Sequence, residues 1–189
     1  MILDLSKDGK FAAVTAFKTP SGIDPSVALM EMRSAFPNAD VQFLEGAQLA
    51  GKEHLEIAAT NALHAFKTGL NISRNLAMEV LLYASAQRQI DVAIRMLGVK
   101  PDSKTVGLAA FSDSRDEVES LQNRMAQFLK TDLDDALLDD WSSSKASVIV
   151  KRYGIENSEL DAIKMPGQPV KEAVQKAVIE RVALLSTRT

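Results

Sequence analysis

Apolar residues are concentrated in three short stretches of the chain, one of which, residues 41–45, alternates with polar residues, and these stretches predict three β-strands. The strands are expected at residues 11–17, 41–45 and 104–111. A helix is expected between the first two strands, because Asp24 can cap free backbone amides and Pro25 suits the first helical position. That helix should end near Phe36, since Pro37 disfavours helical geometry in the residue before it.

Helical periodicity dominates the middle of the chain. Residues 52–67 carry apolar side chains at i, i+3, i+4 and i+7, which predicts an amphipathic helix that ends at Gly69. A second helix is expected to start around Ser73, with Asn71 or Ser73 as its cap. It is apolar almost all round, and such a helix is usually buried on most sides. The helical pattern continues, with a kink, through residues 87–97.

The C-terminal half also reads as mainly helical. Ser114 and Glu117 form a capping box, which predicts a helix that runs to about Lys130. The acidic stretch 131–140 is expected to be a short helix with solvated carboxylates, and a further short helix should end before Gly154. The last helix, about 170–185, is expected to turn one apolar side towards the core: Val170, Val174, Val178, Val182 and Leu185.

These elements predict an α+β (mixed α/β) fold, in which a small sheet of three to four strands packs with a predominantly helical domain. Apolar residues make up 46% of the 189 residues, which is enough for a real core. We expect residues 1–189 to form a single domain, with residues 131–145 as a candidate flexible segment.

Composition narrows the class of protein. The chain has no cysteine, so disulfides and thiolate metal sites are excluded. The N-terminus does not resemble a signal peptide, and no apolar run is long enough to cross a membrane. We therefore expect a cytoplasmic protein without a membrane partner.

Charge is distributed unevenly along the chain. Residues 62–105 hold six Lys/Arg and three Asp/Glu, whereas residues 113–140 hold nine acids and three bases. The first segment could attract phosphate groups, or the imbalance could simply be a property of solvated surfaces.

The motifs of common enzyme classes are absent from the sequence. It contains no glycine-rich phosphate loop, no HExxH zinc motif and no GxSxG nucleophile elbow. His64 lies on a polar helical face and is expected to be exposed and non-catalytic. Glu79 interrupts an apolar helix, so it either accepts hydrogen bonds from a helix start or an arginine, or it has a functional role. We expect no catalytic residues, no metal and no cofactor.

The segment EVLLYASAQRQIDVAIRMLGV, residues 79–99, resembles the signature of the regulatory subunit of the KEOPS tRNA-modifying complex, a family also called PRPK-binding proteins. One position departs from the pattern, since Ala86 stands where the family favours glycine. The matching positions are Glu79, Ser85, Gln87, Gln89, Ile90, Ala93, Ile94 and Gly98.

The resemblance implies a non-catalytic binding protein. Members of this family bind the small protein kinase of KEOPS on its N-lobe and stimulate it, and they contact the other subunits through that kinase. The complex makes threonylcarbamoyladenosine in tRNA. Archaeal members also help to recruit tRNA by its single-stranded 3′ CCA end.

Two sets of candidate site residues follow. For tRNA we expect a helix-to-helix junction where cations and free amides meet, with a capped junction and solvated charges as the alternative. These residues are Lys67, Asn71, Ser73, Arg74 and Arg88. For the kinase we expect apolar residues that lie outside the two faces assigned to the core, with a second packing layer as the alternative. These core faces are Ile90, Ile94 and Leu97, and Val174, Val178 and Val182 on the last helix. The candidate residues for the kinase are Val92, Met96, Ile179 and Ala183.

A different function class also remains open at this level. The chain could be a small-molecule-binding domain or an enzyme with a pocket around Glu79. A deep polar cleft would favour that alternative, and an exposed apolar patch would favour the binding subunit.

Overall fold

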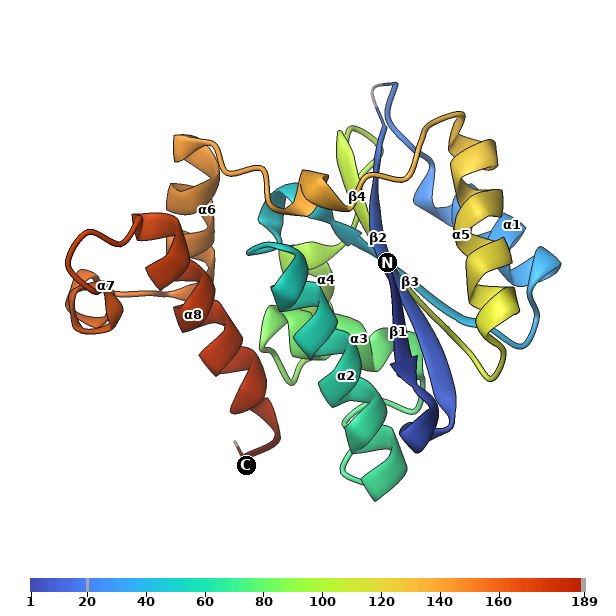
Figure 1. The fold of residues 1–189 in the computed structure, drawn as a ribbon, viewed down its shortest axis with the longest axis horizontal. Helices are drawn as coiled ribbons and strands as arrows, with labels where there is room; N and C mark the ends of the chain where they lie inside the picture. The colour runs from blue at the N-terminus through green and yellow to red at the C-terminus, as the bar shows by residue number, and fades with distance from the viewer. Residues whose placement is uncertain (20, 188–189) are drawn as a thin grey trace.

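The computed structural model describes residues 1–19 and 21–187, and it combines helices with one antiparallel sheet (Figure 1). The strands lie in the order β1-β2-β4-β3, and every neighbouring pair is antiparallel. The strands are β1 (Ile2–Leu5), β2 (Lys10–Lys18), β3 (Asp40–Glu45) and β4 (Thr105–Ser112). The α+β prediction and its three strands are confirmed, whereas β1 was not identified from the sequence.

Both faces of the sheet are covered by helices, which explains why β2 and β4 are almost continuously apolar. Ala13 and Phe17 of β2 lie in the core beneath α1 and α5, and Val14 and Ala16 lie in the core on the other face. In Figure 1, α1 and α5 lie on one side of the sheet and α2 lies on the other. Successive side chains of a strand point to opposite faces of the sheet, so the strands contribute side chains to two separate cores.

Helices α1 (Pro25–Ala35) and α5 (Arg115–Leu129) cover one face. The Asp24 carboxylate accepts hydrogen bonds from two first-turn amides of α1, as predicted. The capping box of α5 is only half formed. Ser114 Oγ accepts from the Glu117 amide, but the Glu117 carboxylate accepts from Ser112 Oγ instead of reaching back to Ser114.

Helices α2 (Lys52–Thr68), α3 (Leu76–Ser85) and α4 (Ile90–Leu97) lie on the other face. Helix α3 is buried on nearly all sides, as its composition predicted. Its predicted caps were wrong: Asn75 caps α3 by accepting from the Met78 amide, because Asn71 and Ser73 lie in the preceding loop. Between α3 and α4 the chain makes a real break at Ala86, which has a left-handed φ of 51°. A glycine would adopt this conformation without strain, which accounts for the glycine that the family favours here.

The remaining helices are α6 (Ser143–Tyr153), α7 (Asn157–Ile163) and α8 (Val170–Ala183), which lie together at one end of the molecule (Figure 1). Helix α7 was not predicted. Val170 is 49% exposed, so it was wrongly assigned to the buried side of α8, which begins at that residue. Among the described residues, no helix has the length and apolar character needed to span a membrane.

The acidic segment forms a short 3-10 helix, η3 (Asp135–Leu138), and its carboxylates are not simply solvated. Asp135 accepts a hydrogen bond from Thr15 Oγ1 at 2.5 Å, and Asp139 accepts one from the Lys52 amide at 2.9 Å. The segment therefore ties the sheet to the start of α2. The other 3-10 turns are η1 (Ser6–Asp8), η2 (Gly46–Gln48) and η4 (Leu185–Thr187).

The Ala84 carbonyl joins three helices. It accepts hydrogen bonds from His54 Nε2 of α2 and from the Tyr153 hydroxyl of α6, both at 2.8 Å. His54 Nδ1 accepts from the Ala50 amide at 3.0 Å, so the buried ring is neutral and carries its proton on Nε2. The pKa of His54 is lowered to about 4. Burial is the main cause, the hydrogen bond to Ala84 partly opposes it, and the nearby Lys145 ammonium contributes to the lowering.

This depressed pKa gives folding stability a pH dependence. The unfolded chain takes up a proton at His54 near pH 6.5, whereas the folded chain does so only near pH 4, so stability falls as pH drops between these values. We expect the unfolding free energy to lose about 2 kcal/mol from this residue between pH 7 and pH 5. Urea unfolding of wild type and His54→Gln at both pH values measures this contribution as the difference in pH dependence.

The exposed His64 supplies a matched control. His64→Gln should keep the wild-type pH dependence, because it leaves the buried ring untouched. If His54→Gln keeps the full acid destabilisation, the buried histidine does not cause it.

Candidate functional site

Glu79 lies in the first turn of α3 and organises the loop that precedes the helix. Its side chain is 0% exposed, and its carboxylate accepts hydrogen bonds from the amides of Ile72 (3.0 and 3.1 Å) and Ser73 (2.6 Å). Glu79 therefore accepts hydrogen bonds, as the structural interpretation expected, but its donors are loop amides, and the expected helix start or arginine was wrong. A binding pocket around Glu79 is not supported, because both oxygens are engaged and out of contact with solvent.

The loop residues proposed for tRNA have mixed environments. Asn71 Nδ2 donates to the Ser73 carbonyl at 2.8 Å, and the buried Ser73 accepts from the Asn75 amide through its hydroxyl at 3.2 Å. Arg74 is exposed between them. Asn71 and Ser73 thus shape the loop, and Arg74 offers its charge to solvent.

The other two tRNA candidates lie away from Arg74. Lys67 Nζ donates to the Lys7 carbonyl at 2.8 Å and lies 3.6 Å from the Asp8 carboxylate. Arg88 is exposed and follows the far end of α3, which is about 15 Å long. The structure therefore brings together only Asn71, Ser73 and Arg74.

The structure contradicts the exposure that was expected of the α4 candidates for the kinase contact. Met96 is only 9% exposed and Val92 packs half-buried against the core, whereas Ile90 and Ile94 are 45% and 48% exposed. The reason is the break at Ala86: it sets a new rotation for α4, so that Ala93, Met96 and Leu97 face inwards. The exposed apolar stripe on α4 is therefore formed by Ile90 and Ile94, one helical turn apart.

A groove runs beside this stripe, between α1 and α4. It has a volume of about 570 Å³, and the β3 residue Phe43 contributes to its lining. Six large apolar side chains line it: Leu29, Phe43, Met78, Leu81, Ile94 and Val99. Pro25, Ser26, Arg33, Gln42, Ser73, Asn75 and Gly98 complete its wall.

A second hollow lies where α2 and α3 meet the C-terminal end of α8. It measures about 240 Å³ and is lined by residues that include His64, Leu70, Tyr83 and Ala183. Of the α8 candidates for the kinase, Ala183 is exposed here and Ile179 is half-buried. Burial raises the pKa of the Tyr83 hydroxyl, and the neighbouring Glu79 carboxylate raises it further.

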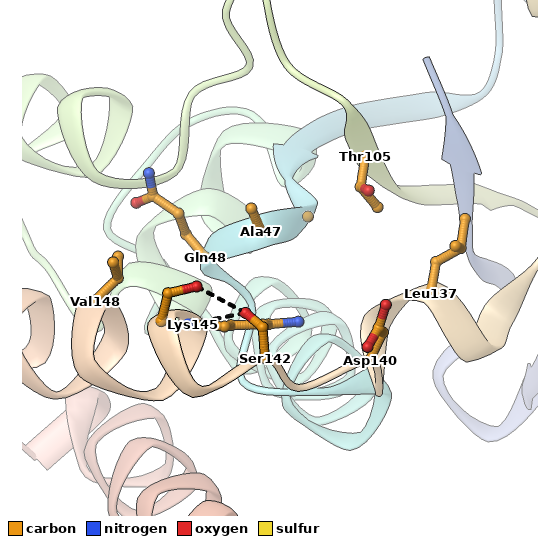
Figure 2. Close-up of a pocket in the computed structure, with 10 residues that line it drawn as sticks. Ala47, Gln48, Thr105, Leu137, Asp140, Ser142, Lys145 and Val148 are labelled. Carbon is orange, nitrogen blue, oxygen red and sulfur yellow. Dashed lines mark hydrogen bonds between the residues drawn. The ribbon is translucent and has the colours of Figure 1, made fainter. Parts of the chain in front are cut away.

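A third pocket, of about 420 Å³, lies between η2 and the start of α6, and sequence reasoning missed it (Figure 2). Lys145 lies in its wall with a buried side chain, whose ammonium donates to the Leu138 carbonyl at 2.9 Å and lies 5.5 Å from the Trp141 ring centre. Burial lowers the pKa of Lys145. A lysine beside a run of serines gave no sequence signal for this pocket, because its burial arises only when η2 packs over α6.

The polar side chains of this pocket bond to one another and to the backbone. The hydroxyls of Ser142 and Ser144 are 2.9 Å apart and share a hydrogen bond, and Ser142 also caps α6 through the Lys145 amide. In these interactions the partners of the Ser142 hydroxyl are another serine hydroxyl and a backbone amide. Among the described residues, no three His, Asp or Glu side chains lie close enough together to hold a metal ion.

Comparison with known proteins identifies one family. A family model described as kinase binding protein CGI-121 matches residues 26–186, which include the Glu79 loop, α4 and most of the α1–α4 groove. No curated protein matches the sequence. The match confirms the resemblance to the KEOPS regulatory subunit family.

The contribution of the Glu79 hydrogen bonds to the unfolding free energy can be tested. A glutamine at position 79 keeps one acceptor but turns an amide NH₂ towards the backbone donors, so we expect Glu79→Gln to lower the unfolding free energy by about 2–4 kcal/mol. Urea unfolding provides the measurement. Glu119→Gln is the matched control, since Glu119 pairs with Arg115 on an exposed surface and should cost less than about 1 kcal/mol. Equal effects of the two substitutions would show that the loop amides do not depend on Glu79.

Proposed function

The chain belongs to the CGI-121 family of kinase-binding proteins, and from this we propose that it is the regulatory subunit of a KEOPS-type tRNA-modifying complex. In this role it binds and stimulates the small protein kinase of the complex and reaches the other subunits through that kinase. The observation that carries the proposal is the family match over residues 26–186.

The exposed stripe on α4 is the best-supported contact with the kinase. Ile90 and Ile94 expose nearly half of their side-chain surface, and the half-buried Val92 lies on the same short helix. Exposed apolar surface beside a groove is typical of a protein-binding site. Ile179 and Ala183 on α8 form the second candidate face.

We propose that the chain regulates and does not catalyse. Two observations support this: the Glu79 carboxylate is buried and engaged by backbone amides, and the lysine in the pocket at α6 is bonded to a carbonyl. Its place of action would be the cytoplasm, where tRNA modification takes place.

We further propose that the chain helps to recruit tRNA through the single-stranded 3′ CCA end. The exposed guanidinium groups of Arg74 and Arg88 are suited to phosphate contacts, and Asn71 and Ser73 shape the loop that carries Arg74. Lys67, which bonds to the Lys7 carbonyl, adds positive charge farther along the surface. The hollow beside Leu70 and Tyr83 offers a partly apolar slot of about 240 Å³ for a nucleotide base.

The kinase proposal is tested by isothermal titration calorimetry with the purified partner kinase. Ile90→Glu combined with Ile94→Glu should weaken binding by about 30-fold or more, because a central apolar anchor is worth roughly 2 kcal/mol or more. Both side chains are exposed, so the variant should fold normally. Ala183→Glu tests the α8 face and is expected to bind like wild type.

The calorimetric outcomes distinguish an error in the choice of contact face from an error in the proposed function. Loss of binding in Ala183→Glu alone would move the contact to α8. Failure of the wild-type chain to bind the kinase at all would contradict the regulatory role.

The tRNA proposal is tested by mobility-shift titration at several salt concentrations. Two phosphate contacts on a single strand imply a log–log salt slope of about −1.4 for wild type. Arg74→Glu with Arg88→Glu should reduce both the affinity and the slope. A tRNA without its CCA end should bind wild type about as weakly, and the two losses should not add, since they remove the same contact.

Lys171→Glu with Lys176→Glu is the matched control, because it makes the same change of charge on exposed positions of α8. If the control weakens tRNA binding as much as the arginine variant, the effect is one of net charge and the junction is no tRNA site.

A further inference from the structure

The groove between α1 and α4 has a composition that specifies what it binds. We propose that it receives an apolar side chain from an extended surface segment of the partner kinase, with a carboxylate next to that side chain in contact with Arg33. The inference rests on the proposed kinase-binding function and adds the chemistry of the kinase segment.

The apolar part of this inference comes from the lining of the groove. Leu29 of α1, Phe43 of β3, Met78 of α3 and Ile94 of α4 reach it from four different elements. Side chains from four elements form a preformed concave surface, so an incoming apolar side chain is desolvated on several sides at once. A volume of about 570 Å³ has room for a side chain as large as leucine or phenylalanine and for the backbone that carries it.

The carboxylate of the kinase segment is inferred from the charge of the groove. Arg33 is the one ionisable residue among those that line it, and its side chain is exposed at the last turn of α1. An apolar groove with a single guanidinium favours a segment that pairs an apolar side chain with an acid, and it disfavours a basic segment. The carboxylate fixes the orientation of the segment, and the apolar side chain supplies most of the affinity.

The groove also continues into the surface already assigned to the kinase. Ile94 belongs both to the groove and to the exposed stripe, and Ile90 extends that stripe by one turn. Met30 of α1, which follows the lining residue Leu29 in the sequence, is 66% exposed. One partner can therefore cover the stripe and fill the groove together, and the family match makes the kinase that partner.

A plugging variant tests the groove directly. Ser26 is exposed and lines the groove, so Ser26→Trp should fill it with an indole and weaken binding of the purified kinase by roughly tenfold or more in calorimetry. Val27 is 44% exposed in the same turn of α1 but does not line the groove, which makes Val27→Trp the matched control. Circular dichroism verifies that both variants are folded.

The charge is tested with Arg33→Glu and Arg33→Gln. The glutamate should weaken kinase binding more than the glutamine, and the difference between the two should shrink as salt rises, because exposed charges are screened. Equal binding by both variants and wild type would overturn the assignment of a carboxylate.

Photo-crosslinking identifies the occupant. A benzoylphenylalanine at position 26 should capture a peptide of the kinase in which an apolar residue stands next to Asp or Glu, and the same group at position 27 should capture little. Crosslinking to a second copy of this chain, or normal kinase binding by Ser26→Trp, would overturn the groove proposal and leave kinase binding intact. Absence of any binding by the wild-type chain would overturn both.

Discussion

The buried carboxylate of Glu79 is the interaction on which this region of the structure depends. A charged group that is 0% exposed carries a large desolvation cost, which here is offset by the amides of Ile72 and Ser73. Those amides belong to the loop that joins α2 to α3, so satisfying the carboxylate also dictates the path of the loop. The loop in turn holds Arg74 outwards, while Ser73 is buried and Asn75 caps α3.

Helix α3 transmits this order to the rest of the helical layer. Its C-terminal carbonyl at Ala84 accepts from both His54 and Tyr153, which ties α2 and α6 to the same point. Two residues later, the left-handed turn at Ala86 releases the chain into α4. The exposed stripe of α4, the loop that joins α2 to α3 and the α8 end of the molecule are therefore all positioned against one buried helix. This arrangement suits a protein that presents surfaces to partners.

The different roles of the buried ionisable residues and the exposed apolar residues also fit a binding protein. The buried ionisable groups are engaged in holding elements together: Glu79 bonds to a loop, Lys145 to the Leu138 carbonyl, and the His54 ring to two backbone groups. Exposed apolar residues, in contrast, include Met30 on α1 and Ile90 and Ile94 on α4, and Ile94 also lines the groove between these helices. Polar groups thus stabilise the scaffold, and exposed aliphatic side chains supply the surface for association.

The sequence by itself determined the elements whose signals are local. Some signals act within a few residues: Asp24 with Pro25, Gly69, Gly154 and the short apolar runs of β2 and β4. Each of them appears in the structure as expected. The family signature was also readable, because it is a contiguous segment of α3 and α4.

Contacts between distant segments were decided only by the tertiary structure. Strand β1 is too short to show a clear alternation and exists because β2 pairs with it, and the acidic segment loses part of its solvation because Thr15 and the start of α2 bind it. The most consequential case is α4. Its sequence carries apolar residues at more angles than one packed face can bury, so periodicity alone could not choose between Ile90 with Ile94 and Met96 with Leu97. The turn at Ala86 made that choice, because it sets the rotation of α4 against the core.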